Sequence, residues 1–212
     1  MTELNIISVE PTEAFPYKPP TAEILKKYPH VFKLRETLPP RFFKSAFDKL
    51  VALFLIVLST PILLLLKLAF VIEGWLIPEN KGPMLFYYNG VSAGKIIPKY
   101  KIRLIKTKYI DPEGAKRHDW IAFSAEWTPD SRTHVGQFVK KFYLDELPQF
   151  WNVLKGEMSV VGPRPHMLNH TKQYNELTEN FMVRHFVKPG ITGLAQIRGL
   201  RGEITDMKYM QE

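Results

Sequence analysis

The chain has 212 residues, enough for one domain with a substantial core or for one domain and an appendage. It contains no cysteine, which excludes disulfides and thiolate metal sites. The formal net charge of +8 favours anionic partners such as lipid headgroups, nucleotide-linked substrates or nucleic acid, without choosing among them.

The first segment, residues 1–40, is rich in proline and has no sustained apolar period, so we expect an irregular N-terminal arm. Acidic residues, among them Glu3 and Glu10, stand where a secretory signal needs a basic start and an apolar core. The arm therefore does not resemble a secretory signal.

Residues 50–66 form an apolar stretch without a charged side chain. As a straight helix it would measure about 25 Å, short of the roughly 30 Å of bilayer hydrocarbon. Pro61 lies inside it and interrupts the helical hydrogen bonds, and the hydroxyls of Ser59 and Thr60 can satisfy the freed carbonyls. Lysine flanks the stretch on both sides, whereas a spanning helix usually shows an asymmetry of positive charge.

These observations favour a re-entrant membrane helix that breaks at Pro61 and returns to the face it entered. The two alternatives are a spanning helix and a buried helix of a soluble protein. We expect residues 41–80 to comprise the re-entrant helix and an interfacial segment, where Trp75 and lysine side chains lie among the headgroups.

The next segment, residues 81–108, contains two runs of strand-forming residues that flank Asn89-Gly90 and Gly94, so we predict a short antiparallel β-hairpin with its turn there. The second run is basic and has no acidic residue: it carries Lys95, Lys99, Lys101, Arg103, Lys106 and Lys108. It would attract anionic headgroups and phosphates. The alternative is a solvated edge strand that lysines protect from aggregation.

Two adjacent carboxylates, Asp145 and Glu146, precede apolar residues at helical spacing. The pattern predicts a short helix that begins at or just after the pair. Free N–H groups and the helix dipole favour negative charge there. Because adjacent helical residues point about 100° apart, we expect different roles, one acid as nucleophile and one as metal ligand. The alternative is that both acids only cap the helix.

Two segments, LDELPQFWNVLKGEMSVVGPRP at 144–165 and KPGITGLAQIRG at 188–199, resemble the bacterial sugar transferase family, the monotopic polyprenyl-phosphate phosphoglycosyl transferases. The resemblance covers about residues 47–203 and leaves out the N-terminal arm. Members normally continue past the position of Glu212 with another helix, so we expect this chain to be truncated or to lack that element.

The resemblance implies transfer of a sugar 1-phosphate from a UDP-sugar to polyprenyl (undecaprenyl) phosphate. This is the first membrane step of exopolysaccharide, O-antigen or glycoconjugate biosynthesis, at the cytoplasmic face of the bacterial inner membrane. Asp145 would form a covalent phosphosugar intermediate, and Glu146 would hold Mg²⁺.

The resemblance also implies six substrate-binding positions: Lys101, Arg103, Arg132, Arg164, Pro165 and Arg198. It implies a membrane break at Ser59, Thr60 and Pro61. The chain departs from the family pattern at Asn89 and His134, which replace arginines. It also departs at Lys140, which keeps the positive charge of the usual arginine but cannot form its bidentate hydrogen bonds to a carboxylate or phosphate. These departures leave open a catalytically inactive relative that acts as a membrane-bound assembly or binding partner.

The expected fold is α+β: a monotopic membrane protein with a re-entrant helix-break-helix hairpin, and a small cytoplasmic catalytic domain at 81–212 of amphipathic helices and the β-hairpin. The expected partners are the UDP-sugar, the polyprenyl phosphate and the membrane. A basic nucleic-acid-binding protein is a further alternative. The apolar stretch at 50–66 and the lack of a recognition motif argue against it, so no nucleic acid is expected.

Overall fold

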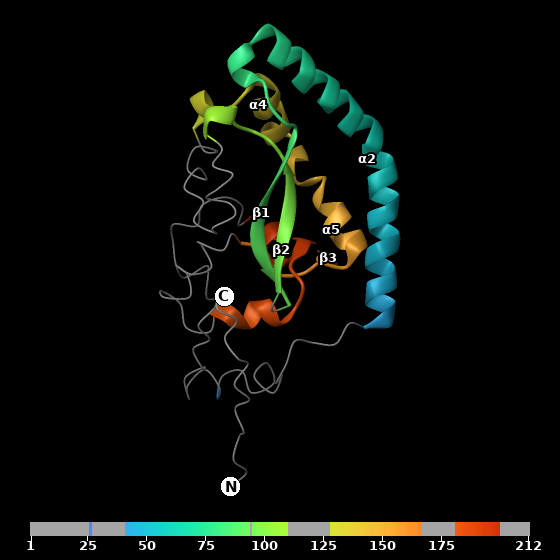
Figure 1. The fold of residues 1–212 in the computed structure, drawn as a ribbon. Coiled ribbons are helices and arrows are strands. Elements are labelled where there is room, and N and C mark those ends of the chain that lie inside the picture. The colour runs from blue at the N-terminus through green and yellow to red at the C-terminus, as the bar shows by residue number, and fades with distance from the viewer. Residues whose placement is uncertain (1–25, 27–40, 94, 110–127, 167–180, 200–212) are drawn as a thin grey trace.

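The computed structural model describes residues 26, 41–93, 95–109, 128–166 and 181–199 (Figure 1). A long helix, α2 (Phe42–Leu76), curves along one side of a small domain. A β-hairpin of β1 (Leu85–Ser92) and β2 (Lys95–Ile102) runs through the middle of that domain. The mixture of helices and strands that we predicted is confirmed. The arm predicted at residues 1–40 lies outside the described residues, apart from residue 26.

The other described elements are short. The helices are α4 (His134–Lys141), α5 (Gln149–Lys155) and α7 (Leu194–Ile197). A second pair of strands, β3 (Ser159–Val161) and β4 (Gly190–Thr192), is parallel. Short 3₁₀ helices lie at Pro78–Asn80, Thr107–Tyr109, Pro129–Ser131, Leu144–Glu146 and Phe181–Phe186.

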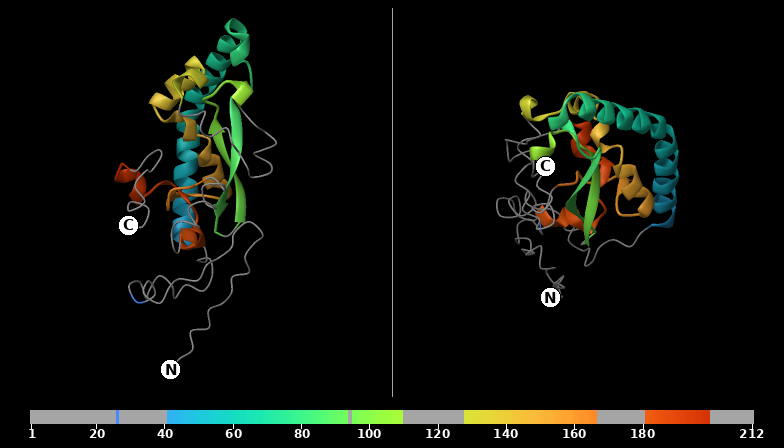
Figure 2. Two further views of the ribbon diagram at one scale, coloured as in Figure 1. Left: turned by 90° about the vertical axis from the view of Figure 1, so that its left-hand side faces the viewer. Right: turned by 45° about the horizontal axis from the view of Figure 1, so that its top comes forward.

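Helix α2 continues through Pro61 and bends partway along its length instead of breaking into two helices (Figures 1 and 2). Pro61 deprives the carbonyl of Val57 of its N–H donor. The Ser59 and Thr60 hydroxyls donate to the preceding carbonyl, that of Ile56, at 3.2 and 2.7 Å. A proline inside a packed helix kinks it at the cost of one hydrogen bond. The predicted break is therefore a bend, and the re-entrant path through a membrane stays a prediction.

One side of α2 is apolar and exposed. Its 35 residues would extend about 50 Å if straight, and by length and composition it is the one helix of the described residues that could cross a membrane. The exposed large apolar side chains along it are Phe42, Phe43, Phe47, Leu50, Leu53, Phe54, Val57, Leu58, Ile62, Leu64, Leu65, Leu68, Val71, Ile72, Trp75 and Leu76. A surface of this extent is compatible with a monotopic membrane protein.

The opposite side of α2 packs on two separate apolar clusters, one for each half of the helix. The C-terminal half contributes Leu66 and Phe70, which pack with Ile102, Leu104, Ile105 and Val139. The N-terminal half contributes Ala52, which packs with Ile97, Val153 and Met158. Helix α5 lies between α2 and the hairpin in this second cluster (Figure 1). The bent helix therefore frames the elements that carry the two adjacent acids.

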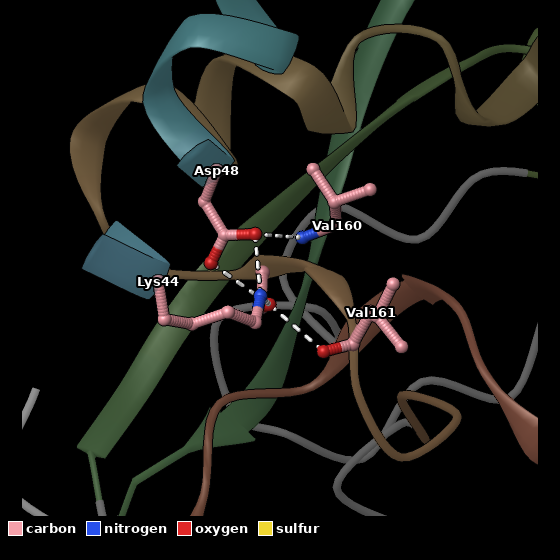
Figure 3. Close-up of polar contacts among 5 residues, drawn as sticks. Lys44, Asp48, Val160 and Val161 are labelled. Carbon is pink, nitrogen blue, oxygen red and sulfur yellow. Dashed lines mark hydrogen bonds and ion pairs between the residues drawn. The ribbon is translucent and has the colours of Figure 1, made fainter. Parts of the chain in front are cut away.

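A buried carboxylate fixes the N-terminal half of α2 to β3. Asp48 accepts a hydrogen bond from the Val160 backbone N–H at 3.0 Å and one from the Ser159 hydroxyl at 2.9 Å (Figure 3). Lys44, one turn earlier, forms an ion pair with Asp48. These bonds join α2 to the strand that leads into Gly162.

The hairpin turn does not lie at Asn89-Gly90 as predicted. Asn89 pairs with Pro98 and Gly90 with Ile97 inside the ladder, so β1 continues to Ser92. The chain reverses after Ser92, where Ala93 adopts a left-handed φ of 45°. Gly94, the other predicted turn residue, lies outside the described residues.

The parallel pair of β3 and β4 brings together the two glycine-proline segments at 162–165 and 188–193. The Gly162 N–H donates to the Thr192 carbonyl at 3.0 Å, and the Gly190 N–H donates to the Pro163 carbonyl at 2.9 Å. A Cβ on Gly190 would lie 2.0 Å from the Gly162 nitrogen. Glycine is therefore required where these backbones meet.

Candidate active site

The site centres on a buried ion pair between the 3₁₀ turn Leu144–Glu146 and strand β2. Asp145 is 1% exposed, and its Oδ2 lies 3.1 Å from Nζ of Lys101. Glu146 is partly exposed, and its Oε1 lies 3.9 Å from the same ammonium. The structure thus places Lys101 beside both acids, and its predicted role in substrate binding stays a prediction.

The turn that carries the two acids is set by the end of α4. Tyr143 has a left-handed φ of 55°, which stops that helix and redirects the chain. A non-glycine residue in this region is strained by about 1 kcal/mol, and such strain is found at functional sites. The Leu147 N–H closes the turn on the Leu144 carbonyl at 3.2 Å. Helix α5 begins at Gln149, just after the acids, as the pattern predicted.

Lys99 lies two residues before Lys101 on β2 and is fully buried. Its ammonium donates to the carbonyl of His166 at 3.0 Å and lies 4.4 Å from the ring centre of Tyr88. Burial lowers the pKa of Lys99 well below its usual value, the charge of Lys101 lowers it further, and Glu146 opposes the change. The sequence placed Lys99 in the basic strand but did not identify it as a site residue; the signal was its two-residue spacing from Lys101.

Two arginines complete a group of basic residues that we call the cationic cluster: Lys99, Lys101, Arg164 and Arg184. Arg164 lies in the glycine-proline segment 162–165, and Arg184 lies in the 3₁₀ helix Phe181–Phe186. Arg164 and Arg184 both lie close enough to lower the pKa of Lys99 by their charges. A guanidinium N–H of Arg184 donates to the Arg164 carbonyl at 2.6 Å. Arg164 and the following Pro165 are half-buried.

Two histidines lie beside the cationic cluster: His185 is buried and His166 is half-buried. Burial, with the charges of Arg184 and Lys99, lowers the pKa of His185 to about 3. Burial and the neighbouring cations also lower the pKa of His166 well below its usual value. Both imidazoles are therefore neutral at pH 7 and add no positive charge to the cluster.

Arg103 makes the contacts of a structural residue. Its guanidinium donates to the carbonyls of Pro83, Ile105 and Asn80 at 2.8, 2.9 and 2.8 Å, and it is fully buried. These bonds tie the hairpin to the end of α2, because Asn80 follows that helix. These three bonds give Arg103 a structural role, and its predicted role in substrate binding stays a prediction.

The two other arginines predicted as substrate-binding lie on different elements. Arg132 is half-buried just before α4, and its backbone bridges to Ile105. Arg198 is exposed at the end of α7. Their predicted roles stay predictions.

Few side chains at the site could serve as ligands for a metal ion. Among the described residues no three or more histidine, aspartate or glutamate side chains gather where they could hold a metal ion. Oδ1 of Asp145 is buried, and it has no hydrogen-bond partner among the described residues. Two carboxylates suit Mg²⁺, which commonly takes one or two protein carboxylates and completes its shell with water and substrate phosphate.

Comparison with known proteins agrees with the motifs. Residues 39–212 match the profile of the family described as "Bacterial sugar transferase". Over 173 residues, or 81% of this chain and 34% of the relative, the chain is 39% identical to UDP-glucose:undecaprenyl-phosphate glucose-1-phosphate transferase of Escherichia coli (strain K12). It is 33% identical to undecaprenyl-phosphate galactose phosphotransferase of Salmonella typhimurium, over 75% of this chain and 33% of the relative.

A shorter relative matches over most of its own length. The chain is 36% identical to the exopolysaccharide production protein PSS of Rhizobium leguminosarum bv. phaseoli, over 75% of each protein. By contrast, the matched region spans about a third of the Escherichia and Salmonella proteins. With most of its length matched by the family profile, the chain belongs to the bacterial sugar transferase family.

Proposed function

We propose that this chain transfers a sugar 1-phosphate from a UDP-sugar to polyprenyl phosphate, with Asp145 as the nucleophile. The observation that carries the proposal is the buried Asp145 carboxylate, 3.1 Å from Lys101 and beside the cationic cluster. Relatives named as undecaprenyl-phosphate glucose and galactose transferases support the same reaction.

The chemistry would run in two displacements at one phosphorus atom. In the first, an Asp145 oxygen forms a bond to the β-phosphorus of the UDP-sugar, the bond from that phosphorus to the bridging oxygen breaks, and UMP leaves with the electron pair. In the second, a phosphate oxygen of the lipid bonds to the same phosphorus and the aspartyl oxygen leaves. The product is a polyprenyl diphosphate sugar, and two steps replace one difficult encounter between a soluble and a lipid substrate.

Each carboxylate oxygen of Asp145 would have its own task. Lys101 holds Oδ2, which fixes the side chain. Oδ1 has no hydrogen-bond partner among the described residues, so it is the oxygen available for attack. The cationic cluster would offset the negative charge of the diphosphate and of the leaving UMP.

Glu146 is the residue that would hold Mg²⁺. Its side chain is 37% exposed, so an ion bound there can keep water ligands and reach a substrate phosphate. When bound, Mg²⁺ would neutralise diphosphate charge and orient the leaving group.

The exposed apolar side of α2 would place this site at a membrane surface. If the bent helix α2 stays within the cytoplasmic leaflet of the inner membrane, it would hold Asp145 at headgroup height, where the phosphate of the lipid acceptor lies. Labelling of single cysteines introduced before and after α2 would test this path. Both are expected to react from the same face, and reaction from opposite faces would contradict it.

The reaction itself is tested with the chain in lipid nanodiscs, undecaprenyl phosphate, Mg²⁺ and a panel of radiolabelled UDP-sugars. We expect one sugar label to move into lipid with release of UMP, and the Asp145→Asn variant to lose both signals. If no UDP-sugar supports transfer, the chain is an inactive relative that acts as a binding or assembly partner.

A further inference from the structure

Gln149, the first residue of α5, is an unexplained buried polar residue. It is 0% exposed, and neither Oε1 nor Nε2 has a hydrogen-bond partner among the described residues. Four residues earlier, Oδ1 of Asp145 is also buried, and it too has no hydrogen-bond partner among the described residues. Three unsatisfied polar atoms thus occur within five residues of chain.

The neighbours of Gln149 show which way it faces. Asn152 lies three residues later, on the same side of α5. Its Oδ1 accepts from the Tyr100 N–H at 3.3 Å and its Nδ2 donates to the Pro98 carbonyl at 2.7 Å, so this side of α5 faces β2. Asp145, on the preceding turn, pairs with Lys101 of the same strand. Gln149 therefore lies between these two contacts, in the layer between α5 and β2.

No contact among the described residues explains a glutamine at this position. A buried polar group without a hydrogen bond costs about 1–3 kcal/mol, whereas an apolar side chain of similar shape costs nothing of this kind. Asn152 shows the contrast, because it is equally buried and both ends of its amide are bonded. A buried amide that no described residue satisfies, four residues from a carboxylate proposed as nucleophile, calls for a partner such as a bound ligand.

We propose that the Gln149 amide binds the sugar 1-phosphate unit at Asp145, with Nε2 donating to a phosphoryl oxygen and Oε1 accepting from a sugar hydroxyl. The pairing follows from the chemistry of the two groups. An amide presents a donor and an acceptor side by side, and phosphate alone offers only acceptors. A sugar 1-phosphate carries both kinds of group in one ligand. This assignment rests on the proposed function, and it makes Gln149 a further substrate-contacting residue.

The test compares wild type with Gln149→Met, which has nearly the same shape and no hydrogen-bonding amide. Gln137→Met on α4 is the matched control, because Gln137 is exposed. Thermal unfolding, transfer kinetics, and the thermal shift caused by glucose 1-phosphate and galactose 1-phosphate are measured for each protein. The thermal shift needs no turnover.

We expect Gln149→Met to unfold at the same temperature as wild type or higher and to lower kcat/KM about 10- to 100-fold, the loss of one or two hydrogen bonds to a charged ligand. It should also lose the stabilisation by sugar 1-phosphate that wild type shows. Gln137→Met should match wild type in all three measurements.

A lower unfolding temperature with unchanged kcat/KM would overturn the inference, because Gln149 would then be structural. An equal thermal shift in wild type and Gln149→Met, or none in either, would also overturn it. If wild type transfers no sugar, the proposed reaction fails. A thermal shift with sugar 1-phosphate that wild type and Gln137→Met show and Gln149→Met lacks would still support the Gln149 site.

Discussion

Glu73, near the end of α2, accepts a hydrogen bond of 2.6 Å from the backbone N–H of His134, the first residue of α4. Its second oxygen accepts from the Val135 N–H at 3.2 Å. A side chain of the apolar helix thus caps the helix that leads into the catalytic turn. Bonds of this kind fix Asp145 relative to α2 and, if α2 lies in a membrane, relative to the lipid.

The Glu73 cap predicts a specific loss of stability. Glu73→Gln should lower the free energy of unfolding by about 2 kcal/mol, because the N–H groups of α4 lose a charged acceptor. Glu79→Gln, which removes only an exposed ion pair with Lys106, should have a much smaller effect. Denaturant unfolding followed by circular dichroism measures both, and equal losses would contradict the capping role.

The pair of Lys101 and Asp145 predicts strong coupling between two substitutions. Lys101→Met should destabilise the protein by about 3–5 kcal/mol, because it leaves a buried carboxylate without its cation. Adding Asp145→Asn should restore much of that loss, because the amide carries no charge. A double-mutant cycle gives the coupling energy. Additive effects would mean that the two side chains do not depend on each other.

Gly90 predicts a steric requirement beside the cationic cluster. A Cβ there would lie 2.5 Å from Cε and 2.8 Å from Nζ of Lys99, and 3.0 Å from the carbonyl of His166. Gly90→Ala should therefore displace the Lys99 ammonium and cost about 1–3 kcal/mol. The double variant Gly90→Ala, Lys99→Ala removes two of these three contacts. The stability lost on adding Gly90→Ala to Lys99→Ala should be smaller than the stability that Gly90→Ala costs the wild-type protein. Equal losses in the two backgrounds would contradict the steric explanation.

The buried imidazole of His185 predicts a loss of stability in acid. The pKa of His185 is about 3 in the folded protein and about 6.5 in the unfolded chain, so the unfolded state binds more protons between these values. His185 therefore does not lower the free energy of unfolding above about pH 6.5, and it lowers that free energy progressively as the pH falls from 6.5 towards 3. The fall in unfolding free energy between pH 7.5 and pH 5.5 should be smaller in His185→Asn than in wild type. An unchanged fall would contradict the neutral buried imidazole.

The sequence predicted the elements whose signal is local. The apolar stretch at 50–66, the hairpin and the helix after Asp145 and Glu146 each follow from composition and spacing over a few residues. The hairpin turn was misplaced because Asn89-Gly90 is a strong turn signal, yet Gly90 lies inside β1 where Lys99 needs the space. The sequence shows the glycine but not the side chain that requires it.

Features that depend on distant partners did not follow from the sequence. The strands β3 and β4 have three residues each and lie far apart in the sequence, so no local pattern predicts that they pair. The cap by Glu73 joins positions 61 residues apart. The resemblance implied a substrate-binding role for Arg103, but it could not show the three backbone carbonyls that accept from its guanidinium, because only the fold brings them together.

The central claim, that Asp145 carries the sugar phosphate during transfer, is tested most directly by mass spectrometry of the protein after reaction with its UDP-sugar in the absence of lipid acceptor. The added mass should equal one sugar phosphate, map to the peptide that contains Asp145, disappear on addition of undecaprenyl phosphate, and be absent from Asp145→Asn. Transfer to lipid by a protein that never shows this adduct, or an adduct on another residue, would contradict the claim.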